Sequence, residues 1–253
     1  MKPIFYLLSI LTQVFISLAQ INILSRVGFS YREEPYSCGL LILSFTVLLF
    51  MILKFFVLQK KLNLKIYNKT NFKTSNWSGG STKELYIFPP NSSYVNRDFS
   101  IRISSAKVEV EKSEFTSFPG VSRKLMVLDG NLKINHENHH SINLGPLEVD
   151  SFMGDWKTTS VGICTDFNVM TQGELKSELT SLVLPTNKKQ ELKIDRSWSS
   201  VFIYLHSGNI EITVFGKKAM LSSGELLVME YWKYDSMTIL ANEDSQIVLT
   251  KIK

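Results

Sequence analysis

The 253-residue sequence has few cysteines, glycines and prolines: two, 13 and seven, respectively. This scarcity excludes a collagen-like or low-complexity chain, and a hydrophobic fraction of 44% excludes a wholly disordered one. The two cysteines, Cys38 and Cys164, are too few for a disulfide framework and too far apart for a Cys-x-x-Cys metal motif. We expect both to be small, buried apolar side chains.

Excess positive charge is absent from most of the chain. Residues 1–61 contain six basic and two acidic residues, and so carry +4 of the net charge of +5. Residues 62–253 contain 22 basic and 21 acidic residues and are nearly neutral. This balance argues against a polybasic surface for phosphates, so we expect no nucleic-acid partner.

Two long apolar runs lie near the N-terminus. Residues 38–58 hold one charge, Lys54, and are long enough to cross a membrane as a helix. Residues 3–24 form either a second membrane helix or a signal peptide cleaved after Ala19. The apolar run continues past Ala19, which favours the retained helix. We therefore expect residues 1–61 to be a membrane anchor of one or two helices.

Basic residues follow the second apolar run closely, and they predict its orientation. They are Lys60, Lys61, Lys65, Lys69 and Lys73. Lysines beside a membrane helix mark its cytoplasmic end. We expect a protein of the cell membrane whose C-terminal part faces the cytoplasm.

The remainder of the chain has the pattern of an all-β protein. Residues 62–75 are polar and are interpreted as a linker, and from Asn76 apolar residues alternate over short segments without an ordinary helix. Asp129-Gly130 predicts a β-hairpin, and Ser207-Gly208 stands in a similar local pattern. This similarity indicates an internal duplication. We expect two small barrels, at 76–171 and 172–253.

Four segments in order resemble the HutD/Ves family of bicupin proteins. They are WSGGSTKEL at 77–85, FSIRISSAKV at 99–108, FTSFPGVSR at 115–123, and FMGDW at 152–156 with DFNVMT at 166–171. The resemblance implies tandem cupin barrels of the RmlC-like jelly-roll type. It also implies a link to histidine utilisation, in which members are regarded as small-molecule binders more than as enzymes. Two features depart from the family pattern: a single residue, Ser78, separates the Trp from the glycines, and a membrane segment is added.

The same segments supply a candidate ligand pocket. Arg102 and Ser104 share one strand face, and a guanidinium group suits recognition of a carboxylate. Glu84 is the alternative partner of Arg102, in which case the two form a structural ion pair. The glycines are otherwise turns, and the large apolar side chains are otherwise core. The candidate ligand-binding residues are Trp77, Gly79, Gly80, Thr82, Glu84, Arg102, Ser104, Phe118, Arg123, Asp155, Asn168 and Met170.

Three of the four histidines, His136, His139 and His140, form a cluster that resembles a metal-ligand set. The cluster lies between two expected strands, whereas ligands inside a barrel project from strand interiors. We interpret it as a solvated hairpin turn and expect neither a metal nor another cofactor.

These features predict a membrane-tethered, non-enzymatic protein that binds a small carboxylate-bearing metabolite. No nucleophile elbow, P-loop or dinucleotide fingerprint is present. Two alternatives stay open: a metal-independent cupin enzyme of the isomerase or lyase type, and a structural interaction domain. A homodimer is also compatible with the sequence.

Overall fold

The computed structural model describes Val47, Phe50 and residues 63–253. The expected membrane helices at 3–24 and 38–58 lie outside the described residues, apart from Val47 and Phe50, which are helical. Within the described part of the chain, no helix is both long and apolar enough to cross a membrane. Leu62–Lys253 forms one compact unit, to which the following description applies.

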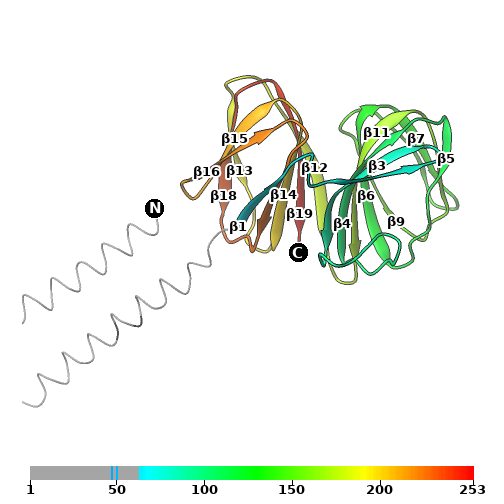
Figure 1. Ribbon diagram of the computed structural model, residues 1–253, viewed down its shortest axis with the longest axis horizontal. Coiled ribbons are helices and arrows are strands. Elements are labelled where there is room, and N and C mark those ends of the chain that lie inside the picture. The colour runs from blue at the N-terminus through cyan, green and yellow to red at the C-terminus, as the bar shows by residue number, and fades with distance from the viewer. Residues whose placement is uncertain (1–46, 48–49, 51–62) are drawn as a thin grey trace, which may run out of the picture. The chain divides into compact units, whose positions relative to one another are not determined.

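This unit is all-β, as the alternation predicted, and contains two barrels made of two sheets each (Figure 1). The first barrel pairs a six-stranded sheet, in the order β2-β3-β4-β11-β6-β9, with a four-stranded sheet, β5-β10-β7-β8. Its strands are β2 (Lys73–Trp77), β3 (Gly80–Phe88), β4 (Ile101–Val108), β5 (Lys112–Glu114), β6 (Val121–Gly130), β7 (Leu132–His136), β8 (Ser141–Leu144), β9 (Val149–Met153), β10 (Thr158–Val161) and β11 (Cys164–Gln172).

The second barrel pairs a five-stranded sheet, in the order β1-β17-β14-β19-β12, with a four-stranded sheet, β13-β18-β15-β16. Its strands are β1 (Asn63–Tyr67), β12 (Ser177–Leu184), β13 (Lys189–Lys193), β14 (Ser200–Ser207), β15 (Asn209–Val214), β16 (Lys217–Ser222), β17 (Leu226–Glu230), β18 (Ser236–Ala241) and β19 (Ser245–Ile252).

The strand orders show an internal duplication. In the first barrel β4-β11-β6-β9 stands against β5-β10-β7-β8, and in the second β12-β19-β14-β17 stands against β13-β18-β15-β16. Each strand of the second set is the eighth after its counterpart in the first. The first repeat ends with β11 at Gln172, and the second begins with β12 at Ser177.

The expected hairpin at Asp129-Gly130 is instead a corner between sheets. β6 and β7 flank this turn but belong to different sheets, as do β14 and β15 around Gly208. Gly130 and Gly208 have φ of 86° and 95°. A Cβ atom at Gly130 would lie 2.4 Å from the carbonyl oxygen of Ile163, so the corner requires glycine. The turn signal was correct, but it did not specify which strands pair.

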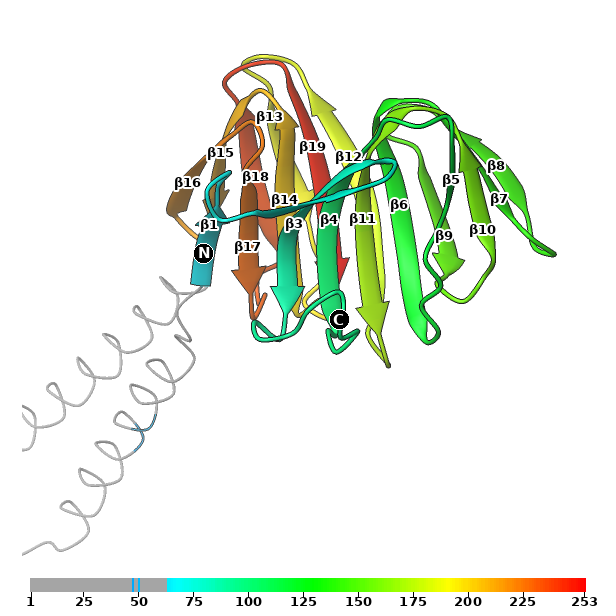
Figure 2. The same ribbon diagram turned by 45° about the vertical axis from the view of Figure 1, so that its right-hand side comes forward.

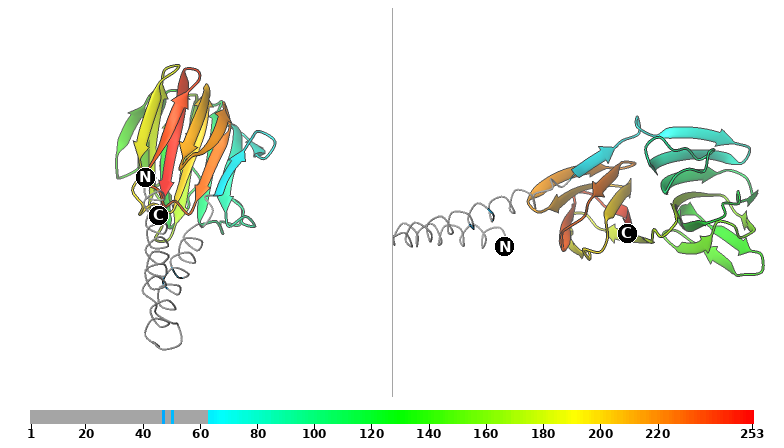
Figure 3. Two further views of the ribbon diagram at one scale, coloured as in Figure 1. Left: turned by 90° about the vertical axis from the view of Figure 1, so that its left-hand side faces the viewer. Right: turned by 90° about the horizontal axis from the view of Figure 1, so that it is seen from below.

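The segment expected to be a linker contains two strands. β1 pairs with β17 of the second barrel, whereas β2 pairs with β3 of the first. The right panel of Figure 3 shows these cyan strands running from the orange second barrel to the green first barrel. Leu64 packs on the core of the second barrel and Tyr67 on the core between the barrels. The polar residues around them obscured this contribution in the sequence.

The two large sheets share a core, and the alternation along β11 explains how it forms. Phe167 and Val169 face this shared core, so Asp166, Asn168 and Met170 face the interior of the first barrel. The buried members of the shared core are Leu85, Ile101, Ile103, Met126, Leu128, Phe167, Val169, Leu179, Phe202, Leu226, Val228, Val248 and Ile252. The polar side chains of β11 are therefore buried on its other face, inside the first barrel.

Candidate functional site

Three neighbouring strands of the first barrel, β4, β11 and β6, position the polar groups of its interior (Figure 2). Met170 on β11 is paired with Arg102 on one side and with Arg123 on the other. Asn168, two residues earlier on the same face, is paired with Ser104. The pairing register thus brings two arginines and their polar neighbours onto one wall.

Arg102 is only 6% exposed and has several partners. Its Nε donates to Glu84 Oε2 at 3.0 Å, and its Nη1 donates to Ser104 Oγ at 3.1 Å. The guanidinium also lies 4.4 Å from the centre of the Tyr94 ring. This geometry shows that Glu84 and Arg102 form an ion pair within the barrel wall.

Arg123 is 8% exposed but has a different environment. Its guanidinium lies beside two aromatic rings that also contact each other, 5.0 Å from the centre of the Phe115 ring and 5.1 Å from that of the Phe152 ring. Among the described residues, no acceptor reaches the buried Nε of Arg123, and no donor reaches the buried Oδ1 of Asn168. Burial lowers the pKa of Arg123 to about 10, which leaves it charged at neutral pH.

Asp166 is the third ionisable group of this interior. Burial raises its pKa to about 7, although the backbone amide of Ala106, donating at 3.3 Å, and the two arginines oppose that rise. The interior of the first barrel therefore contains two guanidinium groups close to this carboxyl group. Within the part of the chain that the structure describes, the buried Nε of Arg123 still lacks an acceptor, which an anionic ligand would provide.

The structure brings together seven of the twelve expected site residues. Glu84, Arg102, Ser104, Arg123, Asn168 and Met170 share the wall described above, and Phe118 packs on Met170. Asp155 is exposed in a turn. The remaining four lie near the turn between β2 and β3, where β3 pairs with the Val108 end of β4 and not with its Arg102 end. They are Trp77, Gly79, Gly80 and Thr82.

The glycines at 79 and 80 have a structural explanation in the chain itself. A Cβ atom at Gly80 would lie 1.9 Å from the carbonyl oxygen of Lys107, and φ at Gly80 is 145°. A Cβ atom at Gly79 would lie 2.0 Å from the ring of Trp77. Close strand approach therefore accounts for both glycines and for the position of Trp77 without a ligand.

Four residues of this interior were not predicted to line it. Asp166 begins the DFNVMT segment but was not among the candidate residues, although its alternation with Asn168 and Met170 assigns it to the same face. Tyr94, Phe115 and Phe152 come from a loop and two other segments of the barrel. Their proximity depends on folding, and no local pattern identifies them.

A groove of about 410 Å³ lies outside this wall, between β1, β3 and β17. Glu84 lines the groove and also accepts the hydrogen bond from Arg102. Neither arginine lines the groove. We place the candidate anion site in the barrel interior because the unsatisfied donor is there.

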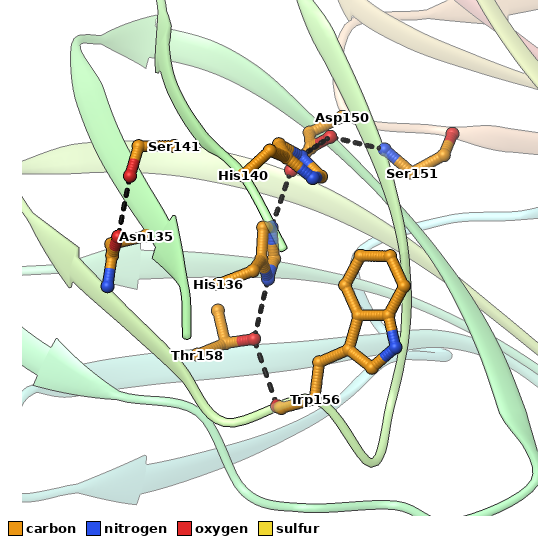
Figure 4. A network of polar contacts seen from close by, with 8 residues as sticks. All are labelled: Asn135, His136, His140, Ser141, Asp150, Ser151, Trp156 and Thr158. Carbon is orange, nitrogen blue, oxygen red and sulfur yellow. Dashed lines mark hydrogen bonds and ion pairs between the residues drawn. The ribbon is translucent and has the colours of Figure 1, made fainter. Parts of the chain in front are cut away.

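The histidine cluster is only in part the solvated turn that the sequence suggested: His139 and His140 lie in the exposed turn between β7 and β8, whereas His136 is buried. His136 is the last residue of β7, is 2% exposed and lies between Thr158 and Asp150 (Figure 4). His140 Nε2 lies 3.0 Å from the other oxygen of Asp150, whereas His139 stacks on Trp156 at 3.7 Å between ring centres. Burial holds the pKa of His136 below its ordinary value, against the opposing effect of Asp150.

A family model described as HutD matches residues 69–249, and no curated protein matches the chain. Solved structures also resemble it, among them the following three. The conserved protein PA5104 from Pseudomonas aeruginosa PAO1 is 20% identical over 76% of this chain and 99% of that one, with a TM-score of 0.65. HutD from Pseudomonas fluorescens SBW25, determined in a formate condition, is 18% identical over 76% and 98%, with a TM-score of 0.60. Bacterial pirin YhhW from Escherichia coli, in complex with nickel(II), is 14% identical over 75% and 98%, with a TM-score of 0.56. At these identities the likeness concerns the fold, which is cupin-like.

Proposed function

This chain belongs to the HutD family, and from that premise we propose that its first barrel binds a small carboxylate-bearing metabolite. Arg102 and Arg123 are the anion anchors, and the role is one of binding or regulation rather than catalysis. The link of the family to histidine utilisation suggests an acid of that pathway. The two buried guanidinium groups on one wall support this proposal.

The single observation that carries the proposal is the buried Nε of Arg123. Leaving a buried donor unsatisfied costs roughly 1–3 kcal/mol, and more when the group is charged. A carboxylate can accept two parallel hydrogen bonds from one guanidinium group. A bound carboxylate would therefore satisfy Arg123. The Phe115 and Phe152 rings would form apolar walls beside it.

We expect Arg123→Met to weaken carboxylate binding by about 10- to 100-fold, because a charge-assisted hydrogen bond contributes about 1.5–3 kcal/mol. Methionine keeps an unbranched apolar side chain beside the two rings and removes the charge together with the guanidinium donors. Calorimetric titration of the full chain in a mild detergent with formate, acetate, urocanate and N-formylglutamate measures the effect.

The matched control is Arg196→Met, which removes an exposed arginine that pairs with Asp235 in the second barrel. Its affinity for the acid should equal that of the wild type. Failure of every acid to bind the wild type, or equal binding by Arg123→Met, would show that the interior arginines are structural.

Asp166 supports a second candidate function, a metal-independent cupin enzyme. A carboxyl group whose pKa burial raises to about 7 suits a general acid or base at neutral pH. Incubation of the chain with each bound acid, followed by product analysis, tests this alternative. Turnover that Asp166→Asn abolishes while binding persists would favour the enzyme over the binding protein.

We further propose that residues 1–61 tether this unit to the cell membrane, with the barrels in the cytoplasm. The apolar runs and the lysines that follow them support this arrangement. Protease added to sealed spheroplasts should not digest the barrels, because it cannot reach the cytoplasm. Alkaline extraction should leave the chain in the membrane fraction. Digestion of the barrels in sealed spheroplasts would show that they face the outside of the cell, opposite to the proposed orientation.

A further inference from the structure

We propose that His136, His140 and Asp150 form a binding site for a divalent transition-metal ion of the zinc class, separate from the arginine wall. Two imidazole nitrogens and one carboxylate group face one another there, with one ligand atom from each residue within 4.8 Å of the others. Figure 4 shows the imidazole rings of His136 and His140 both beside the carboxylate of Asp150. The residues come from β7, the turn after it, and β9.

The distances suit a metal ion with little rearrangement. His136 Nε2 lies 2.7 Å from Asp150 Oδ2, and His140 Nε2 lies 3.0 Å from Asp150 Oδ1. Zinc binds histidine nitrogen and carboxylate oxygen at about 2.0–2.2 Å. Neighbouring ligand atoms around such an ion are thus about 3 Å apart at a right angle and about 3.4 Å apart in a tetrahedron. The two histidine–carboxylate distances are thus within a few tenths of an ångström of the right-angle value, and all three ligand atoms lie within 4.8 Å of one another.

A second observation concerns the other ring nitrogen of His136. Thr158 Oγ1 donates its single proton to the carbonyl oxygen of Trp156 at 3.1 Å, and it lies 2.7 Å from His136 Nδ1. The Thr158 hydroxyl therefore fixes the orientation of the His136 ring, so that Nε2 points at the carboxylate of Asp150.

This arrangement also matches the outer-shell pattern of metal-binding histidines. Such histidines donate their second ring N–H group to a fixed oxygen, which sets the tautomer and the ring orientation. Here the fixed oxygen beside Nδ1 of His136 is the hydroxyl group of Thr158, which also contacts the carbonyl group of Trp156. Asp150 is held similarly, since the backbone amide of Ser151 donates to its Oδ1 at 2.8 Å.

The donor set determines the class of ion. Two imidazole nitrogens favour zinc, cobalt, nickel or copper over calcium and magnesium, which prefer oxygen ligands. Three protein ligands leave at least one coordination position for water. The side chain of His140 is 39% exposed, whereas those of His136 and Asp150 are 0% and 6% exposed. The ion would enter from the His140 side.

The two proposed sites are neighbours but rest on different residues. Phe152 touches both: its ring centre lies 4.4 Å from that of His136 and 5.1 Å from the guanidinium of Arg123. Metal binding can therefore be tested with Arg123 intact, and carboxylate binding with the histidines intact.

The test is titration of the tag-free full chain, stripped with a chelator and dialysed, with Zn²⁺ by calorimetry and with Co²⁺ by visible absorption. We expect one equivalent to bind and to raise the melting temperature. His140→Ala and Asp150→Asn should each weaken binding by at least 10-fold, and Thr158→Val by about 10- to 100-fold. Thermal melts without metal identify any variant that fails to fold, and His140→Ala is the safest because His140 is partly exposed.

The matched control is His139→Ala, which removes a neighbouring imidazole that stacks on Trp156 and is not a proposed ligand. It should retain the wild-type affinity. The proposal fails if no stoichiometric binding occurs. It also fails if His139→Ala weakens binding as much as His140→Ala does, or if folded His140→Ala and Asp150→Asn bind like the wild type. None of these results affects the carboxylate titration with Arg123→Met.

Discussion

Phe202→Ala is expected to destabilise the two-barrel unit by about 3–5 kcal/mol, the range measured when a buried phenylalanine is truncated to alanine. Phe202 lies on β14 of the second barrel, is 1% exposed, and packs in the core that the two large sheets share. Its ring lies 5.0 Å from that of Tyr86 on β3 of the first barrel. The truncation would leave a cavity between the barrels, not within one of them.

The shared core also predicts how the destabilised protein unfolds. The chain has four tryptophans, of which Trp156 lies in the first barrel and Trp232 in the second. We expect one urea transition, detected by tryptophan fluorescence and by far-UV circular dichroism at the same midpoint, and shifted as a whole by the truncation. Two separate transitions, with only the second barrel weakened, would show that the barrels fold independently.

Phe215→Ala is the matched control for this prediction. Phe215 is 57% exposed on the second barrel and contacts the ring of Tyr234. Its truncation should change the free energy of unfolding by less than about 1 kcal/mol. A comparable loss at both positions would mean that the shared core contributes no special stability.

The fold could be predicted from the sequence to the extent that side-chain alternation determines it. Strands and turns depend on neighbours within a few residues, and the all-β body and its duplication follow from them. Pairing depends on contacts across the whole chain, so the corner at Gly130 was interpreted as a hairpin. For the same reason β1, which pairs with β17, was assigned to a linker.

The two sites illustrate the same limit at the level of side chains. Arg102 and Glu84 were both identified, because each stands in a segment with a recognisable pattern, although the pairing of their strands shifts at an irregularity between Glu84 and Tyr86. His136 was misassigned because the whole histidine cluster was placed between two expected strands. Extending the alternation from Leu132 and Ile134 by two residues turns His136 inward, as the structure shows. Asp150 could not be assigned to it from sequence, since β9 approaches β7 only in the folded barrel.

The pH dependence of stability is expected to differ between the wild type and Asp166→Asn. Burial raises the pKa of Asp166 to about 7 in the folded protein, from about 3.9 in an unfolded chain. Between these values the folded state keeps a proton that the unfolded state has released, so the free energy of unfolding falls as pH rises, by about 1.4 kcal/mol per pH unit. The contribution is complete below pH 4 and is lost by the time pH exceeds 7.

The asparagine side chain in Asp166→Asn cannot ionise and should not incur this loss, while its oxygen can still accept the hydrogen bond from Ala106. The variant should therefore gain stability over the wild type by a few kcal/mol between pH 4.5 and pH 8, as measured by urea unfolding at fixed pH values. Asp155→Asn, which removes an exposed carboxylate, should show no such gain. A difference between wild type and Asp166→Asn that is independent of pH would place Asp166 in a solvated or fully paired environment.

The same titration connects stability to the proposed ligand. An ionised Asp166 adds negative charge beside Arg102 and Arg123, both of which interact with it electrostatically. A carboxylate ligand would then meet a less positive interior, so its affinity for the wild type should decrease as pH rises through 7. In Asp166→Asn the affinity should stay constant over that range. If instead both proteins lose affinity equally, a group other than Asp166 controls anion binding, and the arginine wall would have to be reassigned as purely structural or as coupled to a different acid.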